Sequence, residues 1–359
     1  MSMRHRRAFI ALAGLIAATW ASTAQAGDGG RTPIPLPPIE GDLSSEARAV
    51  NNRGQVAGSS FDGILTATIW DWRGKPTPLA PLEGDGHSEA FAINDWGEAV
   101  GDSTGAITSA VRWDRQGVAS RLAPPEGDLD SFARGINARG EVAGYSSRQN
   151  DADADTGVLL QAVRWDAWGN PTVLPPLEGD SEATALAINA FGKVVGYSFS
   201  SGGRDTAVVW NRSGRPRALL PLPGDGGSEA QAINLWGQVV GDSEDGSETA
   251  TRWPRAQPKA LAALARDPDA QAFAINRKGA IAGVSISLAL IHSAVLWASG
   301  GRPVRLAALP GNDQSWALGI NESGDVVGFS AGETSITAVL WPAPRRAPRH
   351  GHRVPTRRH

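Results

Sequence analysis

The sequence contains no cysteine among its 359 residues. This absence excludes disulfides, thiolate nucleophiles, cysteine-ligated metals and a lipid-anchored N-terminal cysteine. Histidine is also scarce, because only His87 and His292 lie outside the two ends of the chain. No Ser/His/Asp arrangement, phosphate-binding loop or histidine-rich metal spacing accompanies them. We therefore predict that the protein is not an enzyme.

Long apolar runs are missing as well, except for one at the N-terminus. A basic start with three arginines precedes the apolar residues 8–20, a stretch too short to span a bilayer comfortably. The small-residue motif Ala24-Gln25-Ala26 follows, so residues 1–26 are interpreted as a signal peptide cleaved after Ala26. Arg6-Arg7 is compatible with either the Sec or the Tat route. We expect an exported protein, periplasmic or extracellular, with no membrane span.

The basic residues are unevenly distributed. Three lie in the N-terminal leader and six lie in the tail, residues 342–359. Removing these nine from the 34 basic residues leaves 25 against 37 acidic residues, so the body carries a net charge of −12. An acidic body argues against a nucleic-acid partner. The tail is rich in Pro, Arg and His and is expected to be disordered.

The chain between these ends is a sevenfold repeat, punctuated by 43 glycines and 24 prolines. Each unit carries an Asn, followed by Gly three and seven residues later and by Ser nine residues later, and it ends on Trp. The asparagines are Asn51, Asn94, Asn137, Asn189, Asn234, Asn276 and Asn321. The tryptophans are Trp70, Trp113, Trp165, Trp210, Trp253, Trp297 and Trp341. A bulky residue at one position of every unit is expected in the core between units.

Each unit predicts four short β-strands. In the second unit we expect them near residues 89–94, 98–103, 109–113 and 119–123. Asn-x-x-Gly is a turn signal between the first two, because both residue types tolerate positive φ. Four strands in 42–45 residues are typical of a propeller blade. We predict an all-β fold, a seven-bladed β-propeller of four-stranded blades over residues 27–341.

The two ends of the repeat predict how the propeller closes. The last unit stops at Trp341 without a fourth strand, whereas residues 34–38 form a strand-like segment that no unit precedes. We expect this N-terminal strand to complete the last blade, which would remove exposed sheet edges. Small residues alternate in the first strand of each unit, as in Ala90 and Ala92, and this predicts that strand to be innermost. We expect a monomer.

The unit resembles a known repeat family. Leu-x-x-Leu-x-Gly-Asp-x-x-Ser-x-Ala-x-Ala-Ile-Asn-x-x-Gly-x-Val-Val-Gly-x-Ser, followed by Ala-Val-x-Trp, is similar to the bacterial extracellular HAF repeat over about residues 34–341. The sequence departs from that pattern at the His-Ala-Phe triplet, where Thr, Ser or Gln replaces His. The resemblance implies an exported or surface location and no particular activity.

Aromatic residues that the repeat does not require are the candidate binding residues. Trp96, Phe191 and Trp236 lie in the Asn-x-x-Gly turns, and Trp72 and Trp168 lie in the turns after the third strand. Both kinds of turn are expected on one face of the disc. There the five side chains could stack on sugar rings or anchor a protein, or they could pack on adjacent turns. A sixth such residue, Trp316, lies in a first strand and is expected in the core.

An acidic insertion in the third unit is a candidate calcium site. Asp151, Asp153 and Asp155 have the spacing that opens a calcium loop. The pattern then fails, since Thr156 occupies the position of the turn glycine and Ala162 that of the bidentate glutamate. The segment is therefore a weak calcium site or a solvated loop, and no other cofactor is expected.

Together these features predict an exported binding or scaffold module that recognises a glycan or a protein at the cell envelope. One alternative is a purely structural repeat protein with no specific ligand. The other is a propeller hydrolase that uses carboxylates in the central funnel. Several inward Asp and Glu side chains would favour the hydrolase.

Overall fold

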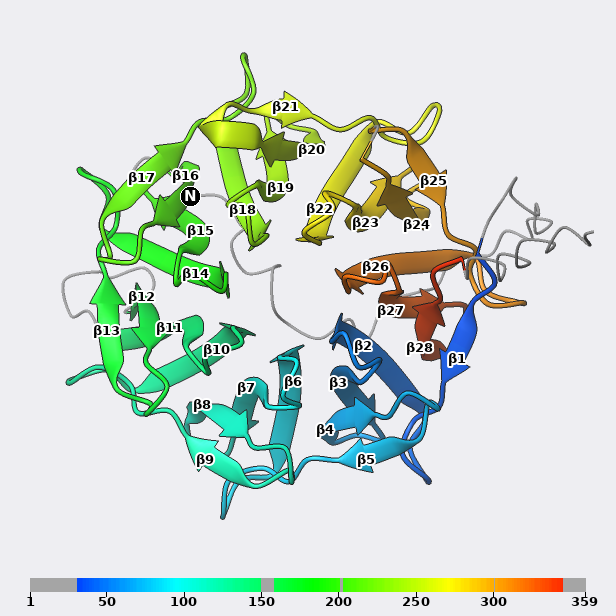
Figure 1. The fold of residues 1–359 in the computed structure, drawn as a ribbon, viewed down its shortest axis with the longest axis horizontal. Coiled ribbons are helices and arrows are strands. Elements are labelled where there is room, and N and C mark those ends of the chain that lie inside the picture. The colour runs from blue at the N-terminus through cyan, green and yellow to red at the C-terminus, as the bar shows by residue number, and fades with distance from the viewer. Residues whose placement is uncertain (1–30, 150–157, 201–202, 300, 345–359) are drawn as a thin grey trace, which may run out of the picture.

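The computed structural model describes residues 31–149, 158–200, 203–299 and 301–344. It confirms the predicted fold, a propeller of seven four-stranded antiparallel sheets around a central axis (Figure 1). The one helical element among the described residues is the short 3₁₀ turn η1 (Pro254–Ala256). No helix in the described ranges is long and apolar enough to cross a membrane.

The blades are numbered 1 to 7 in the order of the sequence repeats. Blade 1 contains β2 (Ser44–Val50), β3 (Val56–Phe61), β4 (Leu65–Trp70) and β5 (Pro76–Pro78), and blade 2 contains β6 (His87–Ile93), β7 (Ala99–Thr104), β8 (Thr108–Trp113) and β9 (Ala119–Arg121). Blade 3 contains β10 (Asp130–Ile136), β11 (Val142–Gln149), β12 (Val158–Trp165) and β13 (Pro171–Leu174), and blade 4 contains β14 (Glu182–Ile188), β15 (Val194–Phe199), β16 (Asp205–Trp210) and β17 (Pro216–Leu219). Blade 5 contains β18 (Gly227–Ile233), β19 (Val239–Glu244), β20 (Glu248–Trp253) and β21 (Lys259–Ala260), and blade 6 contains β22 (Asp269–Ile275), β23 (Ile281–Ile286), β24 (His292–Trp297) and β25 (Pro303–Arg305). Blade 7 contains β26 (Gln314–Ile320), β27 (Val326–Ala331), β28 (Ile336–Trp341) and β1 (Ile34–Leu36).

The N-terminal strand closes the propeller, as predicted. Strand β1 pairs antiparallel with β28, with Ile34 opposite Leu340 and Leu36 opposite Ala338 (Figure 1). The first strand of every blade lies innermost and contacts the first strand of the next blade, including β26 with β2. Because β28 is paired on both sides, the ring of blades has no break at the chain ends.

The repeated tryptophans fill the spaces between blades. All seven are fully buried. The indole N–H of each donates to a backbone carbonyl in the loop that leads into its blade, as from Trp113 Nε1 to Ala80 O at 2.7 Å. Small residues of the inner strand, such as Ala90, are also fully buried in these interfaces. The prediction that the tryptophans form the inter-blade core is confirmed.

The seven repeated asparagines form a closed hydrogen-bond ring around the axis. Within its own turn, Asn51 Oδ1 accepts from the backbone N–H groups of Arg53 and Gln55. Its Nδ2 donates to the backbone carbonyl of Asn94 at 3.0 Å, and the same contact recurs from each asparagine to the next. Asn321 completes the circle by donating to Asn51 O at 3.2 Å. These residues were expected to shape turns, and the structure adds that they link all seven blades.

Candidate functional site

The disc has two faces with different chain connections. The turns between first and second strands and between third and fourth strands share one face, called here the turn face. In blade 1 these two turns touch, since a Cβ on Gly54 would lie 3.4 Å from the Cβ of Trp72. The other connections, including the links between blades, lie on the opposite face, called here the loop face. The candidate aromatic residues therefore share the turn face, as predicted.

The five candidate aromatic side chains are exposed but separate. Trp72, Trp96, Trp168, Phe191 and Trp236 have between 56% and 84% of their surface exposed. They belong to blades 1, 2, 3, 4 and 5 respectively, one to each blade. The structure thus distributes them along an arc of the turn face and does not gather them into one cluster.

Two of these indoles also connect adjacent blades. Trp96 Nε1 donates to Ala138 O at 2.9 Å, and Trp236 Nε1 donates to Arg277 O at 2.9 Å. The indole N–H of each therefore binds the Asn-x-x-Gly turn of the next blade, while more than half of each side chain stays exposed. Trp96 and Trp236 thus do both things that were expected as alternatives. Each packs on an adjacent turn, and each also presents an aromatic surface to solvent.

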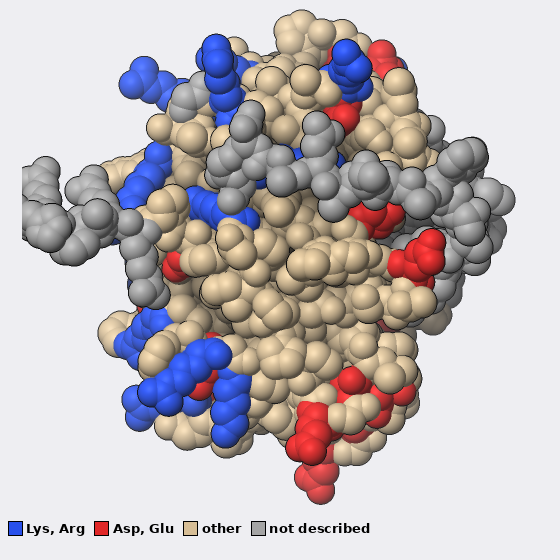
Figure 2. All heavy atoms as spheres, turned by 90° about the vertical axis from the view of Figure 1, so that its right-hand side faces the viewer, with Lys and Arg blue, Asp and Glu red and all other residues tan. Residues whose placement is uncertain are grey.

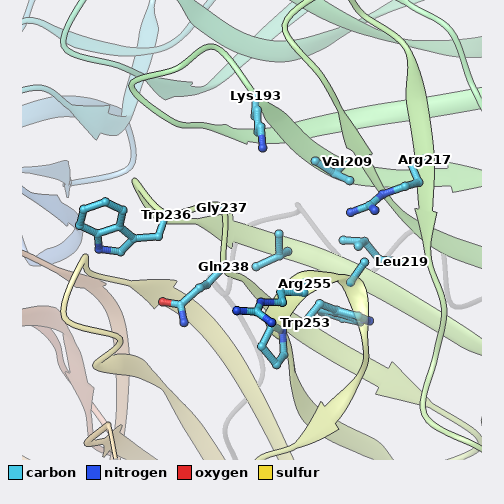
Figure 3. A pocket seen from close by; sticks show the side chains of 12 residues that line it. Lys193, Val209, Arg217, Leu219, Trp236, Gly237, Gln238, Trp253 and Arg255 are labelled. Carbon is cyan, nitrogen blue, oxygen red and sulfur yellow. The ribbon is translucent and has the colours of Figure 1, made fainter.

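A basic pocket lies on the turn face between blades 4 and 5 (Figure 3). It has a volume of about 410 Å³ and is lined by three cationic side chains, Lys193, Arg217 and Arg255. The side chains of Lys193 and Arg217 point toward the middle of the pocket in Figure 3. Trp236 contributes to the rim, but its indole is directed away from the pocket (Figure 3). Sequence reasoning found Trp236 and missed the three cations.

The pocket forms where one blade departs from the repeat. Blades 1, 2, 3, 4 and 6 have a glycine of positive φ four residues after the repeated Trp, such as Gly214 with φ 82°. Blade 5 has Gln257 there, and the positive φ values move to Arg255 (55°) and Ala256 (69°) in η1. Non-glycine residues in this region are strained, and such strain is common at functional sites. The missing glycine was a sequence signal that could have marked this turn.

The charge of the pocket is not compensated by its surroundings. No acidic residue is among those that line it. Lys193, Arg217 and Arg255 form no ion pair with any residue that the structure describes. Three unpaired cations around a cavity favour a ligand that carries a carboxylate, sulfate or phosphate group.

Charge is segregated between the two faces of the disc. In Figure 2, which views the disc from its rim, Lys and Arg gather toward one face and Asp and Glu toward the other. The loop face carries Glu40, Asp62, Glu83, Asp85, Glu126, Asp128, Glu178, Asp180, Asp225, Glu244, Asp245, Asp267, Asp313 and Glu333. Acidic residues on the turn face include turn caps such as Asp71, whose Oδ1 accepts from the N–H groups of Arg73 and Lys75.

The inner strands bring further side chains together that sequence reasoning did not connect. His292, Trp316 and Phe329 stack in series, with ring centroids 4.7 Å and 4.5 Å apart. Trp316 is half-buried in this stack, so the expectation that it lies in the core was only partly right. Burial lowers the pKa of His292, which keeps the imidazole neutral at pH 7.

Several predicted features lie outside the described residues. These are the leader (1–26), the aspartates Asp151, Asp153 and Asp155, and the tail from residue 345 onward. Within the ranges that the structure describes, no group of three or more His, Asp or Glu side chains could hold a metal ion.

Comparison with known proteins supports the fold. A scan against protein-family models and a search of curated proteins both find no match. Among solved structures, the chain is similar to a streptogramin B lyase (TM-score 0.54, 12% identity), covering 86% of this chain and 97% of that one. It is also similar to virginiamycin B lyase from Staphylococcus aureus (TM-score 0.56, 12% identity), covering 86% and 98%. A puromycin hydrolase aligns with TM-score 0.57 and 14% identity over 88% of this chain and 55% of that chain. At these identities the likeness defines a β-propeller and no activity.

Proposed function

We propose that this protein is an exported, non-catalytic binding module that recognises an acidic glycan at the cell envelope through its turn face. The observation that carries the proposal is the pocket formed by Lys193, Arg217 and Arg255, whose charges have no acidic partner among the described residues. The signal-peptide pattern and the HAF-repeat resemblance support the location.

The chemistry of the turn face fits a charged saccharide better than a neutral one. Arginine and lysine donate hydrogen bonds to carboxylate, sulfate and phosphate oxygens. The exposed faces of Trp236 and Phe191 lie on the two blades that border the pocket, and aromatic faces stack on sugar rings. A uronate or sulfated residue would sit in the pocket, and neighbouring sugars would contact these aromatic side chains.

The test is binding of the purified protein to defined oligosaccharides. Oligogalacturonate is expected to bind, and a neutral cello-oligosaccharide of equal length is the control ligand. Lys193→Gln and Arg217→Gln should each weaken binding several-fold, because each removes one charged hydrogen-bond donor. Arg215→Gln removes the same charge from an exposed residue of the same blade that does not line the pocket, so its affinity should stay within about twofold of wild type.

Equal loss of affinity in the Arg215 variant would mean that only general positive charge matters and would contradict the pocket. Absence of binding to any acidic saccharide would exclude the glycan ligand, and a protein partner or a purely structural role would replace it. If the wild-type protein does bind an acidic saccharide, the Trp96→Ala, Trp236→Ala and Trp72→Ala variants test the aromatic contacts: lost ligand binding with an intact fold supports recognition by the turn aromatics.

A further inference from the structure

Blade 2 contains a pair of carboxyl groups that two arginines neutralise. Glu89 and Asp102 lie directly opposite each other on β6 and β7. Arg48 of blade 1 lies 2.9 Å from Glu89, and Arg134 of blade 3 lies 2.8 Å from Asp102. Asp102 Oδ1 also accepts from the backbone N–H of Ala133 at 3.1 Å. Burial raises the pKa of Asp102 to about 6, so it is still ionised and paired at neutral pH.

The Arg134 guanidinium has a well-defined environment. Besides Asp102, it donates to Tyr145 Oη at 3.2 Å. Its carbon lies 4.1 Å from the centroid of the Phe91 ring and 5.2 Å from that of Tyr145. This part of the fold therefore accommodates an organic cation between a carboxylate and aromatic rings.

Blade 5 repeats the carboxyl pair without the arginines. Glu229 and Asp242 lie opposite each other on β18 and β19, at the same distances from the repeated Asn as Glu89 and Asp102. The positions that hold Arg48 and Arg134 around blade 2 hold Leu186 of blade 4 and Phe273 of blade 6.

The second pair is left without a compensating charge. Asp242 is only 6% exposed, and its buried Oδ1 has no hydrogen-bond partner among the described residues. Glu229 accepts a hydrogen bond from Gln231 Nε2 at 3.1 Å, a neutral donor. Neither carboxyl group forms an ion pair with a described residue. A buried carboxylate oxygen without a partner is costly, and a bound cation would remove that cost.

We propose that Glu229 and Asp242 form a binding site for the guanidinium or ammonium group of a ligand, which is held beside Asp242 as Arg134 is held beside Asp102. The site is distinct from the basic pocket and does not depend on the proposed glycan binding. Phe273 occupies the repeat position of Arg134, so the protein supplies no cation of its own from that position.

The charged groups around the site are acidic and therefore favour a cation. They lie between the site and the loop face. Asp205 on β16, Glu244 on β19 and Glu248 on β20 each repel a negative charge on the pair. The pKa of Tyr197 on β15 is raised, chiefly by burial and then by the negative charge of Glu229. From β22 and β23 the corresponding positions are the uncharged Gln271, Phe273 and Val284.

Protonation competes with cation binding. Burial, reinforced by Asp205, raises the pKa of Glu229 to about 8 and raises that of Asp242 well above its ordinary value. At neutral pH the pair therefore holds a proton, which a bound cation displaces. Affinity should rise with pH up to about pH 8, by at most about tenfold per pH unit for one displaced proton.

The test is calorimetric titration of the full chain with n-butylguanidinium, using n-butylurea as the neutral control ligand. We expect binding of n-butylguanidinium alone, tighter at pH 8 than at pH 6.5, with release of a proton measured in two buffers of different ionisation enthalpy. Asp242→Asn should abolish it. Asp245→Asn, which removes a charge from an exposed residue in the turn between β19 and β20, should change affinity less than about threefold.

Phe273→Arg is the decisive variant, because it supplies from the protein the guanidinium that Arg134 supplies beside Asp102. It should fold, gain thermal stability at pH 8 and lose binding of n-butylguanidinium. Binding that survives in both Phe273→Arg and Asp242→Asn would overturn the proposal, since the acidic loop face alone would then be responsible. No binding to the wild-type chain, or binding of calcium in preference to n-butylguanidinium, would overturn it as well.

Discussion

At the scale of single residues, the carboxyl groups of Glu229 and Asp242 make stability depend on pH. An unfolded Glu titrates near 4.3, whereas burial and Asp205 raise the pKa of Glu229 to about 8 in the folded protein. The folded state therefore binds more protons than the unfolded state between about pH 4 and pH 8. Stability from this group is complete below about pH 4 and is lost as the pH rises through 8.

We predict that the melting temperature falls as the pH is raised from 5 to 8.5, and that the fall is smaller in the Glu229→Gln/Asp242→Asn double variant. Thermal unfolding followed by circular dichroism at a series of pH values measures both. Asp102, with a pKa of about 6, contributes a dependence of the same sign in both proteins. Parallel curves for wild type and double variant would show that the pair is not protonated as described.

The same residues show where sequence reasoning stops. Glu229 and Phe273 are visible in the sequence, and their repeat positions can be aligned with Glu89 and Arg134. The lack of a compensating charge beside Glu229 and Asp242 is not visible, because it depends on contact between neighbouring blades. The energetic consequence also depends on burial of the Asp242 side chain, which no repeat pattern contains.

At the scale of elements, the strained turn η1 combines a structural cost with the binding role proposed for Arg255. Arg255 has φ 55°, a conformation that costs a non-glycine residue about 1–2 kcal/mol. The Arg255→Gly variant should therefore unfold at higher denaturant concentration, by up to about 1 kcal/mol of stability. Its affinity for an acidic oligosaccharide should fall several-fold, because one of the three pocket cations is gone.

Arg255→Lys is the matched control for that variant. It keeps both the positive charge and the backbone strain, so stability and affinity should both stay near wild type. Urea unfolding and titration with oligogalacturonate provide the two measurements. A gain of stability in the lysine variant, or unchanged affinity in the glycine variant, would contradict the assignment.

The regular elements were largely predictable, and the irregular ones were not. The strands of blade 2 agree with the expected segments within about two residues, because alternation and turn residues recur in seven copies. The pocket arises where Gln257 replaces the turn glycine, and the result of that replacement depends on how the chain relaxes between blades 4 and 5. The repeat predicts the strands and turns that all blades have in common. The candidate sites lie at positions where one blade departs from the repeat.

At the scale of the whole molecule, closure depends on a strand of three residues. Leu36 of β1 is 1% exposed and packs in the core between blades 7 and 1, whereas Ile34 on the same strand is 46% exposed. We predict that Leu36→Ala costs about 2–5 kcal/mol of stability, as for other buried leucines. Ile34→Ala should cost no more than about 0.5 kcal/mol.

Guanidinium chloride unfolding measures both variants. A release of β1 would also expose the edge of β28, so light scattering of Leu36→Ala should detect association that the control lacks. Equal and small effects of the two substitutions would mean that β1 contributes little to closure.

Because acidic and basic residues gather on opposite faces of the disc, the two faces attract ligands of opposite charge. An anionic ligand is attracted to the turn face and a cationic one to the loop face, over distances of about one Debye length. The two proposed sites, the basic pocket and the carboxyl pair, would therefore receive ligands of opposite sign from opposite sides. Both affinities should weaken as ionic strength rises.

The ring of asparagines makes every blade an interior blade. In an open array of repeats, the terminal units have one neighbour and can unfold first. Here Asn321 donates to the carbonyl of Asn51, so each blade is held by a neighbour on both sides. Removing one blade breaks two of these asparagine hydrogen bonds and two inter-blade cores at once. The remaining six blades cannot close into a ring unless every angle between neighbouring blades changes. We therefore expect the slowest amide protons to exchange at similar rates in all seven blades, with no blade that frays ahead of the others.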